Sequence, residues 1–481
     1  MRVRNTLVPA VFLTVAALAS TACGQKPGVA ELGIGPGGQY YGDGTGQVGA
    51  DGAALDPGAA APGVDPVTGQ PAGNVPGAGG ATGGGSTGGG STGGGGTRPG
   101  PGGGTPGGGG GPGDRTGVTD TTIKIGVHAP VTGAAAFPQQ SFQSGVGVWA
   151  NHINSKGGIH GRKVEIVFRD DRFDPNSARG VCKELAQQQK VFLLIGAGGS
   201  DQIDACARYA TSVNTPYLSA GVHETRPNLG SLNALRTFHA MSLTYEEQVP
   251  LLVNVAKTDL AGKKVAVIVA DNDSLNNFYA KVDGAMKQAI GANVVLSRRI
   301  PKKTDVDAPA IATQICNSGA QAVLWNASPS GLINVSKSMT CGVQFFGPGN
   351  TNGLNIVATG GCPNVSNALF FSSFPGLDKI GQLDPEFDPA YRRKTGSAPD
   401  DIGVALWGAE KLVGAMLQAT GKDLSRERFL ATLVSGKRFD TGVYPGVQWS
   451  GSDHFGGTAM HLLRADCGAR QYRTQRLNVA P

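Results

Sequence analysis

Four passages between residues 123 and 222 decide the fold: IKIGVHAPVTGAAAF (123–137), NHINSKGGIHGRKVEIVFRDDRFDP (151–175), VFLLIGAGGSDQ (191–202) and TPYLSAGV (215–222). Each contains a short apolar run of the kind that forms a buried strand. Between two of these runs, apolar residues recur at helical spacing, namely Phe142, Val146, Trp149 and Ile153. This alternation predicts a parallel sheet covered by helices, with right-handed crossovers.

The same alternation restarts after residue 240 and predicts a second sheet. In the first series we expect strands at 123–127, 164–168, 191–195 and 217–219, with helices at 177–189 and 200–212. In the second we expect strands at 265–269, 294–297, 322–325 and 344–346, with helices near 278–290, 308–318 and 330–340. Later segments predict helices near 402–419 and 424–434 and strands at 447–449 and 460–464. The chain is therefore expected to be an α/β protein with two doubly wound lobes.

The first 22 residues have the pattern of a secretory signal peptide. Arg2 and Arg4 precede an apolar run at 7–19 that is too short for an ordinary membrane-spanning helix. Small residues then precede Cys23, as in a bacterial lipobox, which predicts lipidation of Cys23. An ordinary signal peptide, cleaved at a small-residue site, is the alternative. Lipidation would hold the protein at the cell envelope, on the outer side of the cytoplasmic membrane.

Residues 23–117 are predicted to be a disordered Gly/Pro-rich linker. The segment contains repeats such as GGGSTGGGST and few apolar side chains that could offset the entropy of ordering. We interpret it as a tether. The remainder, 118–481, is too long for one compact core and suits two lobes.

Composition and missing motifs exclude several functions. The formal net charge is only +6, with both signs interspersed, so nothing indicates nucleic-acid binding. The sequence contains no GxxxxGK[ST] phosphate loop, no HExxH and no GxSxG, and its GAGGS is an incomplete dinucleotide fingerprint. We therefore expect no enzyme activity, no cofactor and no metal.

Seven cysteines include Cys23, which leaves six for disulfides in an exported protein. Six cysteines allow 15 pairings, and no Cys-x-x-Cys pair suggests zinc. We favour Cys182–Cys206, Cys316–Cys341 and Cys362–Cys467. In the first two pairs, each partner would lie on or beside a helix flanking the same strand, whereas the third follows mainly by elimination.

Ser200 is the strongest candidate for a binding residue. It follows the predicted strand 191–195 and the turn GAGG, and it opens a predicted helix. The N-terminus of a helix suits an anion such as a carboxylate, and open α/β sheets bind ligands at the carboxyl ends of their strands. Serine is also a favoured N-cap, so a capping role alone is the alternative.

The four passages quoted above resemble the leucine/isoleucine/valine-binding family of type I periplasmic binding proteins, the substrate-binding subunits of branched-chain amino acid ABC transporters. This resemblance implies two lobes joined by three crossovers, which close over a small molecule. It places the first lobe at 118–241 and 374–443. The second lobe would then be 242–373 and 444–481, including a C-terminal tail.

The resemblance also implies ligand-binding residues in the first lobe. Ser200 would bind the ligand carboxylate, and the next loop would contribute Gly221 and Val222 through their backbones. His223 stands where the family has a hydroxyl, with Thr225 as a substitute if the alignment shifts. Phe137 matches a position where an aromatic ring lines the pocket.

The second lobe departs from the family pattern. Leu275 stands where amino-acid binders carry an aromatic residue, unless Phe278 or Tyr279 shifts into its place. Ser328 follows the strand at 322–325, where another aromatic residue is expected. Gly349 and Asn350 replace the acid that would pair with a ligand ammonium, and Asp271 or Asp273 could substitute for it.

Together these features predict a lipid-anchored solute-binding protein of an ABC importer. Its partners would be a small carboxylate-bearing solute, either an amino acid or a related acid or amide, and the permease subunits. The alternative is a ligand-sensing receptor of the same fold that signals to a partner protein. An exported dinucleotide enzyme and a structural envelope protein are less well supported by the motifs.

Overall fold

The computed structural model describes residues 113–302, 307–349 and 351–481. The predicted signal peptide, Cys23, nearly all of the predicted linker and Asn350 lie outside these residues. The described residues belong to the compact unit 103–481, which is one of two units in the chain. Among the described helices, none has the length and apolar character needed to span a membrane.

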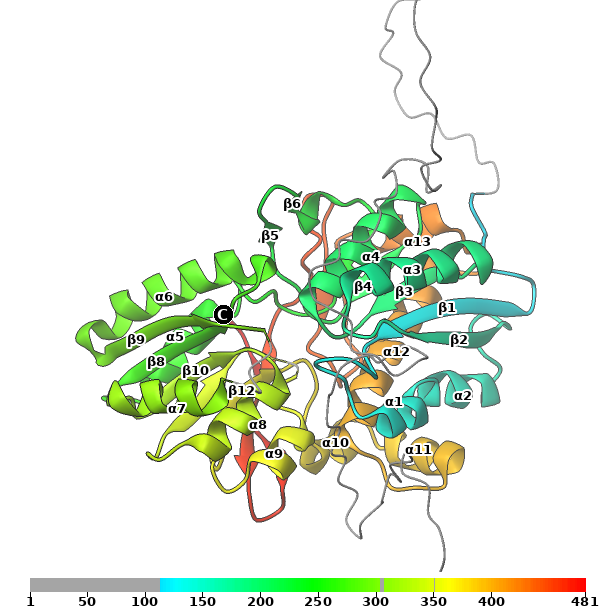
Figure 1. The fold of residues 1–481 in the computed structure, drawn as a ribbon. Helices are drawn as coiled ribbons and strands as arrows, with labels where there is room; N and C mark the ends of the chain where they lie inside the picture. Colours follow the sequence, from blue (N-terminus) through cyan, green and yellow to red (C-terminus); the bar gives the residue numbers. More distant parts are fainter. Residues whose placement is uncertain (1–112, 303–306, 350) are drawn as a thin grey trace, which may run out of the picture. The chain divides into compact units, whose positions relative to one another are not determined.

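The first lobe, as we call it, is a five-stranded parallel sheet with its covering helices. Its strand order is β2-β1-β3-β4-β7, formed by Thr122–Ala129 (β1), Lys163–Asp170 (β2), Leu193–Gly196 (β3), Tyr217–Ser219 (β4) and Phe238–Ala240 (β7). One face carries α3 (Pro175–Lys183) and α4 (Ser200–Ser212), and the other carries α1 (Gln139–Gly145), α2 (Val148–Ser155) and α12 (Asp401–Thr420) (Figure 1). Each face has its own buried apolar cluster, so the lobe has three layers.

The second lobe is a seven-stranded sheet of order β16-β15-β12-β11-β10-β8-β9. Its strands are Val265–Ala270 (β8), Val294–Ile300 (β9), Ala322–Asn326 (β10), Gln344–Gly347 (β11), Leu369–Ser372 (β12), Met460–Asp466 (β15) and Gln471–Val479 (β16). Helices α5 (Val249–Lys257) and α6 (Asn276–Ile290) pack on one face. The other face carries α7 (Ala308–Asn317), α8 (Pro329–Ser338) and α9 (Asn355–Gly361).

The chain passes between the two sheets more than once. After β12, the helices α11 (Phe387–Thr395), α12 and α13 (Arg426–Leu433) pack in the same apolar cluster as β1 and β3. The chain then returns to the second sheet as β15 and β16. The lobe boundaries given above remain predictions.

The remaining elements are short. They are α10 (Leu377–Leu383), β5 (Thr225–Arg226), β6 (Gly230–Ser231), β13 (Arg438–Phe439), β14 (Val447–Gln448), the π-helix Glu184–Gln188 and the 3₁₀ helices Leu232–Ala234, Asp273–Leu275 and Gly291–Asn293.

Several details differ from the sequence-based expectation, and strands β7 and β12 were not among the predicted strands. The helix predicted from Phe142 to Ile153 is broken at Gly147, whose φ of 76° lies in the left-handed region that glycine tolerates. The second sheet is mixed, because β15 pairs antiparallel with both β12 and β16. Strand β16 was not predicted, since most of its side chains are polar and only Tyr472 is buried, so that it gives no apolar pattern.

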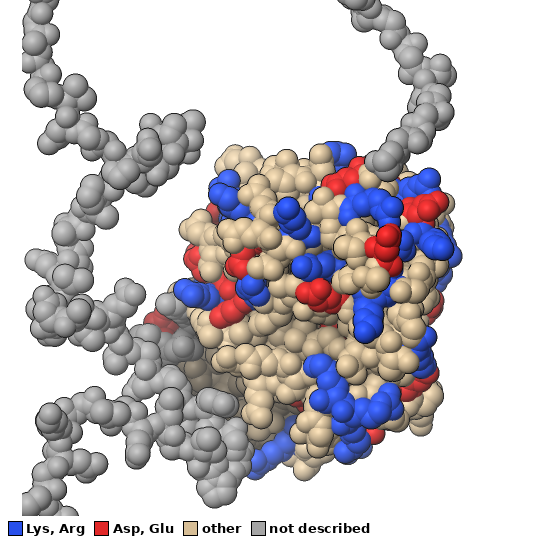
Figure 2. All heavy atoms as spheres, turned by 90° about the vertical axis from the view of Figure 1, so that its right-hand side faces the viewer, with Lys and Arg blue, Asp and Glu red and all other residues tan. Residues whose placement is uncertain are grey.

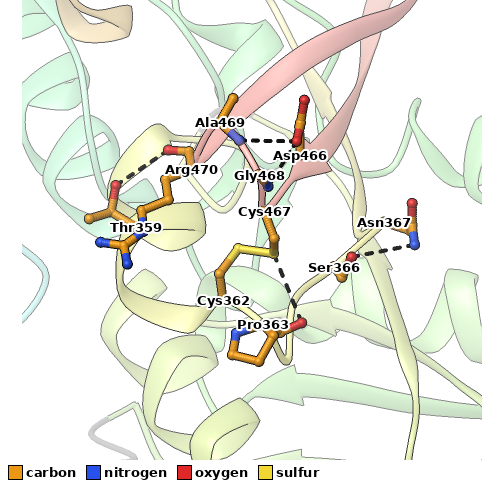
Figure 3. Close-up of a disulfide and its surroundings, with 10 residues drawn as sticks. All are labelled: Thr359, Cys362, Pro363, Ser366, Asn367, Asp466, Cys467, Gly468, Ala469 and Arg470. Carbon is orange, nitrogen blue, oxygen red and sulfur yellow. Dashed lines mark hydrogen bonds between the residues drawn. A yellow bond between two sulfur atoms is a disulfide. The ribbon is translucent and has the colours of Figure 1, made fainter. Parts of the chain in front are cut away.

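The described residues form three disulfides, and they are the three pairings favoured from the sequence: Cys182–Cys206, Cys316–Cys341 and Cys362–Cys467. The first joins α3 to α4, and the second joins α7 to the turn before β11. The third joins the C-terminal end of α9 to the turn after β15, where Cys467 also lies close to the Pro363 carbonyl (Figure 3). Basic and acidic side chains are interspersed on the face of the first lobe that Figure 2 shows.

Candidate ligand-binding site

Ser200 begins helix α4 at the carboxyl end of β3. The N-cap is Gly199 and no side chain caps the helix, so the expectation that Ser200 serves as the N-cap is wrong by one residue. The first N–H groups of any α-helix have no partner within the helix, and they make its N-terminus attractive to anions. Ser200 is 8% exposed, and its hydroxyl is not occupied by capping.

Two glycines shape the turn before Ser200. Gly198 has a φ of 101°, and a Cβ added there would lie 2.4 Å from Pro130 Cδ. A Cβ on Gly199 would lie 2.6 Å from the Phe173 ring. Phe137 Cε2 lies 3.7 Å from the place of a Cβ on Gly198, and the Phe137 side chain is half-buried. The structure therefore brings Phe137 and the turn before Ser200 together, and the role of both residues in ligand binding remains a prediction.

The loop after β4 is more buried than the resemblance implies. Val222 and His223 are both 0% exposed, and Gly221 before them is half-buried. His223 Nε2 lies 3.4 Å from Asp204 Oδ1. Burial alone would raise the pKa of Asp204, but hydrogen bonds from His223 and Arg208 lower this pKa to about 2. The structure thus places His223 in a charged network inside the lobe, and its contact with a ligand remains a prediction.

The predicted residues of the second lobe mostly serve packing and capping. Leu275 is 6% exposed and packs in the apolar cluster that includes Phe278. Ser328 caps α8 by accepting a hydrogen bond from the N–H of Gly331 at 3.1 Å. Asp271 forms an ion pair with Arg299 at 2.8 Å, and its side chain is 67% exposed. An exposed, paired carboxylate is a poor partner for a buried ligand ammonium.

Gly349 has no room for a side chain. A Cβ there would lie 2.6 Å from the Phe371 carbonyl oxygen and 2.7 Å from Met460 Cε. The Gly349 N–H donates to Gln248 Oε1 at 2.9 Å, and Gln248 Nε2 donates to the Leu243 carbonyl at 3.1 Å. Packing at this position therefore excludes the acid that amino-acid binders are expected to carry there.

Two buried amides at the same edge were not among the predicted site residues. Asn326 ends β10 and is 6% exposed, and Asn352 follows β11 and is 2% exposed. Within the described part of the chain, Asn326 Nδ2 and Asn352 Oδ1 have no hydrogen-bond partner. Asn352 Nδ2 donates to the Ala327 carbonyl at 3.1 Å. Buried polar atoms are normally paired, so these two atoms are suited to a polar ligand.

Tyr245 links the two lobes and was also missed. Its backbone N–H donates to the Val222 carbonyl at 3.0 Å, and its ring centre lies 5.8 Å from that of Phe278. Burial raises the pKa of Tyr245, while a side-chain hydrogen bond with Ser200 opposes this rise in pKa. Tyr245 lies in the crossover between β7 and α5, where no periodic pattern could single it out.

Several polar contacts join the lobes, and three of them involve charged side chains near the candidate site. Lys302, after β9, pairs with Asp201 in the first turn of α4. On α6, Lys281 Nζ lies 2.7 Å from Glu224 Oε2, in the loop after β4. The Asn355 N–H donates to Asp401 Oδ2 at 2.7 Å. The carboxyl-end loops of both sheets therefore lie against each other around Ser200 and Tyr245.

Two surface hollows lie elsewhere, beside elements of the first lobe. One, of about 770 Å³, is lined by residues that include Asn233, Leu430 and His454. The other, of about 460 Å³, lies beside Arg179 and Tyr209. Neither contains a predicted site residue, so neither supports the predicted ligand-binding role.

A comparison with known proteins shows the family to which the chain belongs. The family described as periplasmic binding protein matches residues 122–471. The chain belongs to this family. The family is one of binding proteins.

Individual relatives agree with this placement. The chain is 26% identical to Leu/Ile/Val-binding protein homolog 7 of Brucella abortus (strain 2308) over 320 residues, covering 63% of this chain and 78% of that protein. A solute-binding protein of an ABC transporter from Rhodopseudomonas palustris BisB5, in complex with 3,4-dihydroxybenzoic acid, is similar in structure with a TM-score of 0.62. It is 17% identical, covering 75% of this chain and 98% of that one.

A second solved structure is equally similar. The branched-chain amino acid transporter substrate-binding protein from Streptococcus pneumoniae, in complex with isoleucine, has a TM-score of 0.62 and 18% identity, covering 74% of this chain and all of that one. At such identity the likeness shows the fold, which is the type I periplasmic binding fold.

Proposed function

We propose that this protein is the extracytoplasmic solute-binding subunit of an ABC importer. In this proposal it captures a small carboxylate-bearing solute, either an amino acid or a related acid or amide, by closure of its two lobes. The observation that carries the proposal is the position of Ser200. It lies at the N-terminus of α4, at the carboxyl end of β3, beside Tyr245 in the crossover to the second lobe, and its neighbour Asp201 pairs with Lys302 of the second lobe.

The chemistry around Ser200 supports a carboxylate. Backbone N–H groups at the start of a helix and a hydroxyl that does not cap the helix are donors that suit an anion. The two structural neighbours described above are in complex with 3,4-dihydroxybenzoic acid and isoleucine, which share a carboxylate and differ in the amino group. The carboxylate is therefore the part of the ligand that the first lobe would recognise.

The second lobe favours a ligand whose other end is neutral. Gly349 cannot carry an acid, and Asn326 Nδ2 and Asn352 Oδ1 are nearby polar atoms without a hydrogen-bond partner among the described residues. An ammonium buried without a charged partner costs several kcal/mol. Hydroxyl, carbonyl or carboxamide groups could pair with these amides without that cost.

Membrane attachment and location complete the proposal. The lipobox-like sequence before Cys23 supports a lipid anchor outside the cytoplasmic membrane, with the linker as a tether. Permease subunits would dock on the closed form. Labelling of the protein with a radioactive fatty acid, with Cys23→Ala as the control, tests the anchor directly.

Ligand binding by the purified protein tests the central proposal. The panel contains isoleucine, its 2-keto acid, leucinamide and 3,4-dihydroxybenzoate, measured by thermal shift and then by calorimetry. A ligand at 100 times its Kd adds about 2.7 kcal/mol to the free energy of unfolding, which is readily detected. We expect acids without an α-amino group to bind more tightly than isoleucine.

Matched serine variants show whether the bound molecule uses the predicted site. Ser200→Ala should weaken binding about 10- to 100-fold, because a hydrogen bond to a charged group is lost. Ser425 also begins a helix of the first lobe, where it caps α13, and Ser425→Ala should leave the affinity unchanged. Equal affinities for Ser200→Ala and the unmodified protein would contradict the proposed site. Tight isoleucine binding would instead assign the ammonium to Asp201, whose Oδ1 has no hydrogen-bond partner in the described residues.

A further inference from the structure

We propose that Asp171, His128 and Tyr217 form a buried relay of positioning residues, which holds the ligand-binding loops of the first lobe in place. The inference rests on the proposed function and deepens it. It concerns residues that would not touch the ligand, and it explains how the loops around Ser200 and Phe137 keep a fixed geometry.

The relay is a continuous hydrogen-bonded chain in the core. His128 Nδ1 lies 2.8 Å from Asp171 Oδ2, and His128 Nε2 lies 2.7 Å from the Tyr217 hydroxyl. All three side chains are 0% exposed. A carboxylate only accepts hydrogen bonds, so His128 donates through Nδ1 to Asp171, and its Nε2 shares a hydrogen bond with the Tyr217 hydroxyl.

The relay crosses the sheet, and Gly196 makes this crossing possible. His128 is on β1 and Tyr217 is on β4, with β3 between them in the sheet. A Cβ on Gly196, the last residue of β3, would lie 1.7 Å from the Tyr217 hydroxyl and 2.9 Å from His128 Nε2. Any side chain at this position would therefore separate Tyr217 from His128.

Asp171 links the relay to the loop after β2 through a hydrogen bond. Its Oδ1 accepts from the Phe173 N–H at 3.0 Å. Arg172 and Phe173 have φ values of 57° and 54°, which are unfavourable for residues with a side chain. Such a conformation persists only where its surroundings hold it, and the relay anchors Asp171 immediately before this pair.

The strained pair contacts both predicted binding loops. The Phe173 ring lies against Gly199, the residue before Ser200, and the Arg172 carbonyl lies against Gly133, in the loop that leads to Phe137. If the relay were broken, the pair could relax toward ordinary φ values. Both loops would then lose the surface that supports them.

The neighbouring acid restrains one of these loops directly. Asp170 accepts hydrogen bonds from the Val131 N–H at 3.0 Å and from the Thr132 hydroxyl at 2.6 Å. The two adjacent acids of the sequence RDDR therefore have different structural roles. Asp170 binds the loop after β1, and Asp171 belongs to the relay. Neither role requires acid–base chemistry.

Hydrogen exchange of the ligand-free protein tests the relay. Tyr217→Phe removes only the hydroxyl, and we expect amide exchange at 131–137 and 197–202 to become about tenfold faster. Tyr444→Phe is the matched control. The Tyr444 hydroxyl is also buried in the first lobe and donates to the Ala405 carbonyl at 3.1 Å, away from both loops. This control should leave exchange at both loops unchanged.

Two results would overturn the inference. One is unchanged exchange at both loops in Tyr217→Phe, and the other is equal acceleration in Tyr217→Phe and Tyr444→Phe. If Tyr217→Phe does not fold, Asp171→Asn provides the same test. Its amide can still accept from Phe173 while its bond to His128 weakens, so faster exchange is expected at 131–137 and 197–202, and unchanged exchange would again overturn the inference.

A binding measurement completes the test. With whichever acid of the ligand panel binds, Tyr217→Phe should show weaker affinity and Tyr444→Phe should not. Exchange needs no ligand, so a failure of the proposed function would leave the exchange result unaffected. Failure of the relay alone would leave ligand binding by Tyr217→Phe intact.

Discussion

The two lobes share an architecture, but their interiors differ in chemistry. The first lobe buries many charged groups, in hydrogen-bonded or ion-paired arrangements: Arg162, Asp171, Asp201, Asp204, Asp384, Glu410 and Arg426. Among the described residues, helices α5–α9 and the seven strands of the second sheet bury no Asp, Glu, Lys or Arg. Buried charges must be paired and oriented, whereas apolar packing is less directional.

This difference suggests a division of labour at the site. Directional contacts of the first lobe hold the loops around Ser200 in one geometry, as suits recognition of a constant carboxylate. The second lobe presents neutral amides at Asn326 and Asn352 on an apolar base. Substitution of a few neutral side chains there would change the ligand specificity of the protein without disturbing a network of charged groups. The four predictions below test this contrast.

The largest expected effect comes from the disulfides, because two of them are matched across the lobes. Cys182–Cys206 and Cys316–Cys341 have sequence separations of 24 and 25, so loss of either should cost about 3.5 kcal/mol of unfolding free energy through loop entropy. Cys182 and Cys206 are 0% exposed, whereas Cys316 and Cys341 are half-buried. Replacing the buried pair by alanine should therefore cost about 1 kcal/mol more.

Urea denaturation of the two double alanine variants checks this prediction. An equal or greater loss for the Cys316/Cys341 variant would show that the first lobe does not depend more strongly on its interior contacts.

Introducing at position 349 the acid that amino-acid binders are expected to carry should destabilise the second lobe. Gly349→Glu places a Cβ within 2.7 Å of the Phe371 carbonyl and Met460, and we expect a loss of about 3 kcal/mol. Gly342→Ala is the control, because a Cβ there meets nothing within 4 Å. Thermal unfolding measures both. A stable Gly349→Glu protein that binds isoleucine would contradict the idea that packing excludes the acid.

The first lobe should respond to pH through Glu410, which accepts from the N–H groups of Gly147 and Ala150. Burial raises the pKa of Glu410 to about 7. The folded state then holds a proton that the unfolded state releases between about pH 4.5 and 7. The free energy of unfolding should therefore fall as pH rises through this window, by about 3 kcal/mol, and then level off.

Glu410→Gln should remove the share of this pH dependence that Glu410 contributes, because the amide does not titrate, while the buried acids Asp401 and Glu246, whose pKa values burial raises to about 6 and about 7, keep theirs. Glu165→Gln, at a side chain that is 53% exposed, is the control and should retain the whole dependence. Urea midpoints measured from pH 4.5 to 8 decide the question, and an unchanged slope in Glu410→Gln would assign the pH dependence to other groups.

The smallest effect is expected between the lobes, at Lys281 and Glu224. The Lys281 side chain is 50% exposed, so reversing its charge should weaken ligand affinity by less than about fivefold, corresponding to at most 1 kcal/mol. The double exchange Lys281→Glu with Glu224→Lys should restore the affinity, and added salt should reduce the difference. Lys287→Glu, whose partner Asp283 lies on the same helix, should not change affinity. Calorimetry at two salt concentrations makes the comparison.

The sequence alone was sufficient for features encoded in neighbouring residues. The alternating apolar runs predicted both sheets, and the turn before Ser200 predicted a helix at the end of a strand. Periodicity is a local property, so it can be read from contiguous residues. The break at Gly147 was missed because a single glycine barely changes the apolar periodicity of a helix. Strand β16 was missed because a row of mostly polar side chains gives no apolar periodicity.

Only the tertiary structure decided which distant residues meet. Tyr245 lies against Ser200, Gly196 allows Tyr217 to reach His128, and the Phe371 carbonyl fills the space beside Gly349. These contacts depend on the register and crossing of separate strands, which no local pattern records. The family, the fold and the candidate carboxylate position therefore follow from the sequence, whereas the geometry that selects the rest of the ligand follows from the packing of the two lobes.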